Sequence, residues 1–150
     1  MSADYSPSPN ATDMSLADVK WIDLPTVDDE RGLLTWIEAG RDIPFDIRRV
    51  FYLYDVPGGS TRAGHALRTC QQFIVSLSGA FDVLLDDGRE RQRFHLNRSH
   101  FGLYVAPLVW RELDNFSSNS VCLVLASEAY EPNGYLREYE DFLAAVRDGR

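Results

Sequence analysis

A single histidine stands among small residues where charged and amide side chains interrupt an apolar stretch of the chain. The segment Arg62-Ala63-Gly64-His65-Ala66-Leu67 is followed by the amide pair Gln71-Gln72. A neutral imidazole accepts a proton near neutral pH, so it is well suited to general acid–base chemistry. Only three histidines occur among the 150 residues, so a histidine between two expected core strands is unusual. The alternative is a histidine packed and hydrogen-bonded in a core.

Strand geometry decides which of these side chains could act together. The polar segment joins two apolar runs, residues 50–54 and 73–77, which are typical of buried β-strands. Side chains two residues apart share one face of a strand, so a regular strand would place Arg62 and His65 on opposite faces. The glycine at position 64 permits a β-bulge, which would break this alternation.

The composition is that of one packed domain. Hydrophobic residues make up 45% of the chain and aromatic residues 12%. The net charge of −8 argues against a nucleic-acid partner, because phosphates would be repelled. All but one of the fifteen basic residues are arginine, so forked donors suited to a phosphate group are available for a small anionic ligand.

Cysteine content and hydropathy indicate a protein of the reducing cytoplasm. Cys70 and Cys122 are too few and too far apart for a zinc motif, and their apolar surroundings are typical of buried free thiols. No stretch approaches the roughly 20 apolar residues of a membrane span. The N-terminus lacks a basic region followed by an apolar one, so no signal peptide is expected.

The turn signals divide the chain into about eight short strands. This pattern predicts an all-β sandwich or barrel, with a jelly roll as the best single topology. Asp86-Asp87-Gly88 is the clearest hairpin signal. We interpret residues 1–17 as a disordered lead-in and residues 18–150 as a single domain. A stripe at helical spacing predicts a C-terminal amphipathic helix packed outside the sheets: Tyr135, Leu136, Tyr139, Phe142, Leu143 and Val146.

Several segments between residues 21 and 146 occur in an order and spacing that together are specific. They are Asp29-Glu30-Arg31-Gly32-Leu33-Leu34, Arg49-Val50-Phe51-Tyr52, residues 62–72, residues 78–83, Asp86-Asp87-Gly88, Gly102-Leu103-Tyr104-Val105, Val109-Trp110-Arg111, Tyr130 and residues 135–142. On these segments the chain resembles the cupin-fold nucleotide-sugar 3,4-ketoisomerases, the WxcM-like isomerases that act on TDP-4-keto-6-deoxyglucose.

The resemblance implies a homodimeric double-stranded β-helix with a TDP-linked 4-keto-6-deoxyhexose bound in each barrel. It also implies catalysis without a metal or an organic cofactor. Members of the family move a ketone from C4 to C3 of the sugar. This reaction needs a base at C3, a proton donor at C4 and stabilisation of the enediol between them, and each acid–base group is typically worth ~10²- to 10⁴-fold in rate.

Three residues are predicted to be catalytic on this resemblance. His65 is the predicted base. Tyr52 shares its strand face with Tyr54, and either phenol could donate a proton or a hydrogen bond to the sugar. Arg62 could bind phosphate or sugar, or could form a surface ion pair instead.

Further residues are predicted to bind the substrate. Trp110 could stack on thymine or plug the barrel, and Arg111 could reach the diphosphate or the reacting carbonyl. Gln72 could hold sugar hydroxyls. The full predicted binding set is Arg31, Arg49, Tyr54, Gln72, Trp110 and Arg111.

The chain departs from the family pattern at two positions. The family usually has a second histidine where Leu67 stands and commonly has a tyrosine where Phe51 stands. These changes leave open a second function, a TDP-sugar-binding protein without catalysis. A third function, epimerisation at C3 or C5, would use the same enolisation.

His95 shares a face with Arg91 and Arg93 and is expected on a solvated surface. The metal-binding version of the cupin fold needs several histidines and a carboxylate, and His65 stands alone in the first motif region without a nearby Glu in that pattern, so no metal site is expected.

Overall fold

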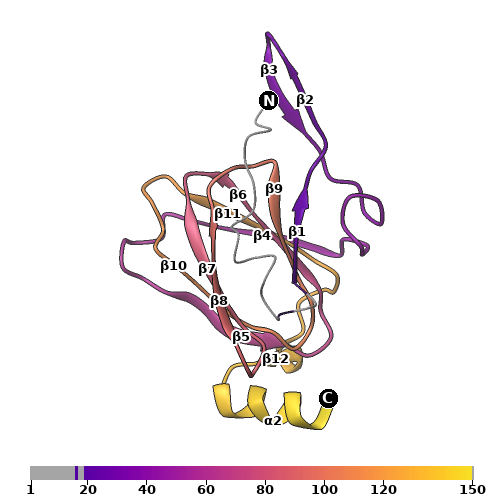
Figure 1. Ribbon diagram of the computed structural model, residues 1–150, viewed down its shortest axis with the longest axis vertical. Coiled ribbons are helices and arrows are strands. Elements are labelled where there is room, and N and C mark those ends of the chain that lie inside the picture. Colours follow the sequence, from indigo (N-terminus) through magenta and orange to yellow (C-terminus); the bar gives the residue numbers. More distant parts are fainter. Residues whose placement is uncertain (1–15, 17–18, 150) are drawn as a thin grey trace.

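Two five-stranded antiparallel sheets face one another in the computed structural model, which describes residue 16 and residues 19–149 (Figure 1). The first sheet has the order β1 (Val19–Asp23), β9 (Phe101–Val105), β6 (Gln72–Ser78), β11 (Val121–Ala126) and β4 (Arg49–Tyr54). The second has the order β12 (Tyr135–Leu136), β5 (Arg62–Leu67), β10 (Trp110–Asp114), β7 (Phe81–Asp86) and β8 (Arg91–Leu96). The predicted all-β jelly roll is therefore confirmed.

The remaining elements lie outside the two sheets. A separate hairpin of β2 (Thr26–Asp29) and β3 (Gly32–Thr35) projects from the end of the barrel opposite the helix α2 (Tyr139–Gly149) (Figure 1). The single-turn helix η1 (Pro132–Gly134) precedes β12. None of the helices in the described part of the chain is long and apolar enough to cross a membrane.

Alternating apolar side chains form the core between the sheets. Ile74 and Leu103 from one sheet pack with Val83, Leu85 and Phe94 from the other. The predicted Asp86–Gly88 hairpin is present, because β7 pairs with β8 across it. Cys70 and Cys122 are both buried and free, as their apolar surroundings predict.

The helix packs against the second sheet at the end of the barrel opposite the projecting hairpin (Figure 1), and it is shorter than predicted. Phe142 is buried against Trp110 and Leu136. The prediction that Tyr135 and Leu136 belong to this helix is wrong, because their backbones pair with β5 as β12 and the helix begins at Tyr139. Tertiary pairing thus overrides a local pattern that also fits a helix.

The predicted lead-in of residues 1–17 lies outside the described residues except for Leu16. Leu16 is 3% exposed and packs in the core between the sheets, and its carbonyl oxygen accepts a hydrogen bond from the Val19 amide. Buried structure therefore begins before residue 18.

A β-bulge at Gly64 confirms that the regular alternation of β5 is broken. His65 pairs with Arg111 of β10, whereas Ala63 pairs with the adjacent Glu112, so Gly64 is the extra residue. Ala63 and Gly64 both have positive φ, 70° and 81°. Because of this bulge, Arg62 and His65 line the same pocket instead of opposite faces.

We expect Gly64→Ala to lower the free energy of unfolding by about 1 kcal/mol, since the left-handed region costs an L-residue roughly that amount. A Cβ at Gly64 meets no atom within 4 Å, so the cost is one of backbone conformation alone. Urea denaturation measures it. Gly58→Ala is the matched control, because a Cβ at Gly58 also meets nothing and its φ is not positive. Equal stability of the two variants would contradict the prediction.

Candidate active site

A pocket of about 320 Å³ opens between the two sheets. Its apolar wall consists of Phe51, Leu53, Ala63, Ile74, Leu113 and Val124. Its polar lining consists of Thr61, Arg62, His65, Gln72, Arg111 and Arg137. The pocket is therefore walled by the barrel core and lined on its polar side from β5, β6, β10 and the segment after β12.

His65 is held inside the pocket wall in its neutral form. Burial lowers the pKa of its imidazole to about 3, and the positive charges of Arg111 and Arg137 act in the same direction. The buried Nδ1 atom has no hydrogen-bond partner among the described residues. The ring of Tyr135 meets the imidazole edge-to-face at 4.9 Å between centroids. In the free protein, His65 is thus an unprotonated base at neutral pH.

Arg111 on β10 pairs directly with His65 on the neighbouring strand β5, and its side chain is buried, with the residue 1% exposed. Its guanidinium donates hydrogen bonds to Gln72 Oε1 at 2.7 Å and to the carbonyl oxygen of Val109 at 2.9 Å. Burial lowers the pKa of Arg111 to about 10, opposed by Cys70 and Tyr135. Its Nε–H is buried with no hydrogen-bond partner among the described residues. The buried cation therefore has a spare donor for an oxygen ligand.

The pocket is cationic in an acidic protein. Arg62, Arg111 and Arg137 line it, and no Asp or Glu is among its lining residues. The chain as a whole carries a net charge of −8, so three arginines without a carboxylate are a local reversal of sign. A low-dielectric, positively charged cavity favours an anionic ligand or an oxygen that becomes negative during a reaction.

Four of the residues predicted from the sequence meet in this pocket: His65, Arg62, Gln72 and Arg111. Arg49 lies behind its wall, where its Nη1 donates to the Tyr135 hydroxyl at 3.0 Å and its guanidinium lies 4.4 Å from the centre of the Phe51 ring. Arg49 therefore reaches the pocket only through its neighbours.

The other predicted residues lie elsewhere. Tyr52 and Tyr54 are 59% and 61% exposed on the outer face of β4, because Phe51 and Leu53 take the inward positions. Trp110 is buried under α2, with its ring edge-to-face to that of Tyr139. This corrects the expectation that these three side chains line the ligand pocket.

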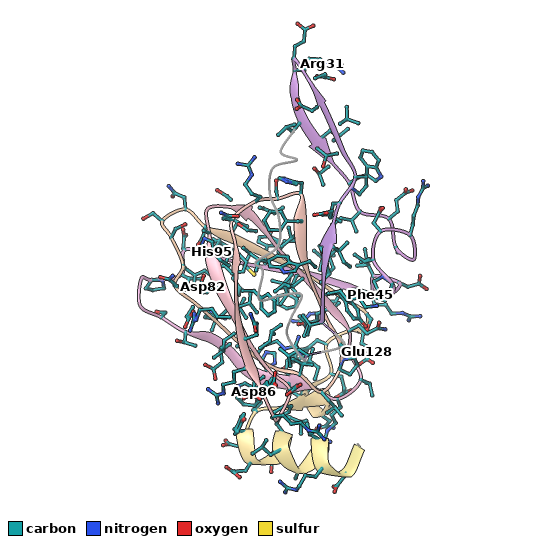
Figure 2. All side chains as sticks on the ribbon, in the orientation of Figure 1. Arg31, Phe45, Asp82, Asp86, His95 and Glu128 are labelled. Atoms are coloured by element: carbon teal, nitrogen blue, oxygen red, sulfur yellow. The ribbon has the colours of Figure 1, made fainter. Side chains whose placement is uncertain are left out.

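Arg31 is also remote from the pocket. It lies at the tip of the projecting hairpin, where it pairs with Asp29 at 2.8 Å (Figure 2). Within one chain, Arg31 cannot contact a ligand held between the sheets.

Two polar lining residues, Thr61 and Arg137, are absent from the predicted set. Arg137 falls within the range of the predicted C-terminal helix without being on its apolar stripe, but it follows β12 and lines the pocket. Leu67, which stands in place of a family histidine, packs against Cys70, Ala126 and Tyr135 and does not line the pocket.

We expect the wild-type protein to lose stability faster than His65→Asn as the pH falls from 7 to 5. The folded-state pKa of His65 is about 3, against 6.5 for an ordinary histidine, so the unfolded chain binds more protons between these values. This group therefore lowers the free energy of unfolding by about 1–2 kcal/mol as the pH falls from 7 to 5. Urea denaturation of both proteins at pH 7, 6 and 5 measures the difference. An identical decline in both proteins would rule it out.

Comparison with known proteins places the chain in a family. The model of the family described as FdtA, WxcM-like, C-terminal matches residues 17–147. A TDP-4-oxo-6-deoxy-alpha-D-glucose-3,4-oxoisomerase from Aneurinibacillus thermoaerophilus is 42% identical over 123 residues, which are 82% of this chain and 88% of that protein.

Solved structures agree. A mutant of the 3,4-ketoisomerase QdtA from Thermoanaerobacterium thermosaccharolyticum, in complex with TDP-4-keto-6-deoxyglucose, superposes with a TM-score of 0.85 at 37% identity, covering 87% of this chain and 95% of that one. The WlaRB TDP-quinovose 3,4-ketoisomerase from Campylobacter jejuni gives a TM-score of 0.82 at 37% identity, covering 85% and 98%. The chain therefore belongs to the FdtA, WxcM-like C-terminal family and has its cupin-like fold.

Proposed function

We propose that this protein is a nucleotide-sugar 3,4-ketoisomerase that moves the ketone of TDP-4-keto-6-deoxyglucose from C4 to C3. The observation that carries the proposal is the pairing of a neutral His65 with the buried, carboxylate-free guanidinium of Arg111 in one pocket. Relatives at 37–42% identity are named as isomerases of TDP-linked keto sugars, which supports the same substrate here.

His65 acts as the base in the first half of the reaction. The imidazole takes the proton from C3, and the electron pair of the C3–H bond forms the C3–C4 double bond. The negative charge moves to O4 and gives an enediolate. Arg111 stabilises this charge, because a preorganised donor in a water-poor site is aimed at an oxygen that becomes anionic.

The second half returns the proton to the neighbouring carbon. The hydroxyl proton passes from O3 to O4, and the imidazolium of His65 delivers its proton to C4. The ketone is then at C3, and no atom has been gained or lost. Among the lining residues His65 offers the one neutral nitrogen base, so one imidazole serves both carbons.

Arg62 and Arg137 bind the diphosphate in this proposal, and Gln72 holds a sugar hydroxyl. Both guanidiniums line the pocket without a carboxylate among the other lining residues, and an arginine fork matches phosphate oxygens. The Gln72 amide oxygen already accepts from Arg111, so its NH₂ group is the part available to a hydroxyl oxygen.

The test is proton NMR of TDP-4-keto-6-deoxyglucose with the purified protein in deuterated water. We expect resonances of a 3-keto isomer to replace those of the 4-keto sugar, with deuterium entering at C3 or C4. No new isomer and no exchange at C3 or C4 would overturn the proposal. Exchange at C5, or inversion at C3 without movement of the ketone, would identify an epimerase instead.

A second candidate is a TDP-sugar-binding protein without catalysis. It is favoured by Phe51, which presents a ring without a hydroxyl to the pocket, and by Leu67, which supplies no imidazole. Micromolar binding of TDP-4-keto-6-deoxyglucose by calorimetry, without proton exchange at C3, would favour this candidate. Exchange at C3 would exclude it.

The proposed reaction uses no metal ion and no organic cofactor. The side chains that line the pocket offer one imidazole and no carboxylate or thiolate, and three guanidiniums would repel a divalent cation. Equal rates before and after dialysis against EDTA are the expected result. Loss of activity that zinc or another divalent ion restores would contradict it.

We also propose a homodimer that works in the cytoplasm. The projecting hairpin exposes apolar side chains, among them Leu33 at 57% and Leu34 at 61%, and a second copy would cover them. A substrate contact of Arg31 would then require the pocket of that second copy. Two free buried thiols support a reducing compartment.

Leu34→Glu is expected to convert a dimer to a monomer, because a charge in an apolar interface is left without a partner. Sedimentation velocity measures the mass. Arg147→Glu, on the helix at the opposite end of the molecule, is the control and should leave the mass unchanged (Figure 1). A dimeric Leu34→Glu protein would place the interface elsewhere.

A further inference from the structure

The imidazole of His65 packs against an aromatic ring. Catalytic histidines are commonly held by a hydrogen bond from one ring nitrogen to a second group. Here Nδ1 is buried with no hydrogen-bond partner among the described residues. The contact that the imidazole does make is edge-to-face with Tyr135, at 4.9 Å and 75°.

Tyr135 is itself held from two sides. Its hydroxyl oxygen accepts a hydrogen bond from Arg49 Nη1 at 3.0 Å. The guanidinium of Arg137 lies 4.4 Å from the centre of the Tyr135 ring, a cation–π distance. The Tyr135 backbone is also fixed, because β12 pairs Tyr135 with Leu67 at the end of the strand that carries His65. Backbone, hydroxyl and ring face are all restrained.

A third aromatic residue closes this arrangement. Tyr130 lies 5.6 Å from Tyr135 between ring centroids, and Arg49 lies 4.9 Å from the Tyr130 ring centre. Arg137 donates to the Tyr130 hydroxyl at 3.5 Å. The two arginines therefore engage the same pair of tyrosines, and neither Arg49 nor Arg137 forms an ion pair within the part of the chain that the structure describes.

We propose that Tyr135 is a positioning residue that fixes the imidazole of His65 in the pocket wall, and that Arg49 and Arg137 hold Tyr135 in place. Its consequence for catalysis rests on the proposed isomerase function, whereas its consequence for the His65 ring does not. The ring of Tyr135 shields one edge of the imidazole from water. Arg137, at the pocket rim, links the bound diphosphate of the substrate to the same support.

Two substitutions separate the role of the Tyr135 ring from that of its hydroxyl. Tyr135→Phe keeps the ring beside His65 and removes only the hydrogen bond from Arg49. Tyr135→Leu removes the ring and lets water reach the imidazole. Tyr139→Phe is a matched control, because it also removes a partly buried phenol hydrogen bond, that to Asp86 at 2.7 Å, but at the start of α2 and outside the pocket.

Imidazole NMR of the free protein is the first measurement, with the His65 signals assigned by their loss in His65→Asn. Wild type, Tyr135→Phe and Tyr139→Phe should show no titration of His65 between pH 8 and 5. In Tyr135→Leu, His65 should titrate within that range, with its midpoint at least one pH unit above that of the wild type. Unchanged His65 signals in Tyr135→Leu would overturn the proposal, whatever the activity of the protein.

Steady-state kinetics is the second measurement. We expect Tyr135→Leu to lower kcat at least 30-fold with KM changed less than threefold, and Tyr135→Phe to lower kcat less than fivefold. If Tyr135→Leu does not fold, Tyr135→Met decides by the same two measurements, since it also removes the ring but fills more of the space. Wild-type NMR and kcat in Tyr135→Met would then overturn the proposal. An inactive wild type would refute the isomerase function and leave the NMR result standing.

Discussion

His65→Asn is expected to lower kcat by about 10²- to 10⁴-fold, the range that one general acid–base group contributes. Asparagine retains a polar side chain of smaller size but cannot accept a proton near neutral pH. Among the lining residues only His65 presents a basic nitrogen that is unprotonated at pH 7. Substrate binding should change little, because Arg62, Arg111 and Arg137 remain. Turnover by NMR and substrate affinity by calorimetry measure the two effects.

His95→Asn is the matched control for this experiment. His95 Nδ1 lies 2.7 Å from Asp82 Oδ1 on the outer face of the second sheet, and Figure 2 labels the two side chains beside one another. Its imidazole is more than half exposed and does not line the pocket, so kcat should be unchanged. A His65→Asn protein with wild-type kcat would remove His65 from the mechanism.

Arg111→Met is expected to lower kcat by about 10²- to 10³-fold, the cost of removing one donor to a developing oxyanion. Its effect on stability should be small, because two changes oppose one another. Removing a buried cation without a counter-ion relieves a desolvation cost, and replacement of buried charges by apolar side chains is often neutral or stabilising by about 1–4 kcal/mol. Against this, Gln72 Oε1 loses its 2.7 Å hydrogen bond, at about 1–3 kcal/mol.

Two further variants separate these effects. Arg111→Met combined with Gln72→Leu removes both polar partners and should be at least as stable as the wild type by urea denaturation. Arg93→Met is the control, because Arg93 is half exposed and pairs with Asp82 and Asp114 outside the barrel. That variant should lose at most about 1 kcal/mol of stability and keep its kcat. A destabilised double variant, or full activity in Arg111→Met, would contradict the role of Arg111.

Local sequence patterns predict the fold correctly where tertiary pairing favours the same structure. The hairpin over Asp86-Asp87-Gly88 is present because Asp86 and Asp87 each accept hydrogen bonds from the backbone amides that follow them. Alternation in β8 places Phe94 inside and His95 outside, as a period of two predicts. Tyr135 and Leu136 fit both a helical stripe and a strand, and only the free edge of β5 selects the strand.

The candidate site could be predicted where its residues lie on regular or nearly regular strands. His65 and Gln72 were found because polar side chains there interrupt an apolar stretch, whereas Arg111 was found through the family resemblance. Tyr52 and Trp110 were misplaced in the pocket, because periodicity separates the two faces of a strand but does not say which face is inside. The surroundings decide this, since Phe51 fills the inner position and α2 covers Trp110.

The sequence by itself determined an all-β domain, the histidine that could serve as a base and, by resemblance, the family. These follow from turn chemistry, hydrophobic periodicity and residue type, which are local properties. Only the tertiary structure decided that the Gly64 bulge brings Arg62 and His65 into one pocket, that Arg111 is buried opposite His65, and that Tyr135 and Arg137 join them. The physical reason is that strand pairing and burial depend on segments far apart in the chain, as where β12 meets β5 and places Tyr135 against the imidazole.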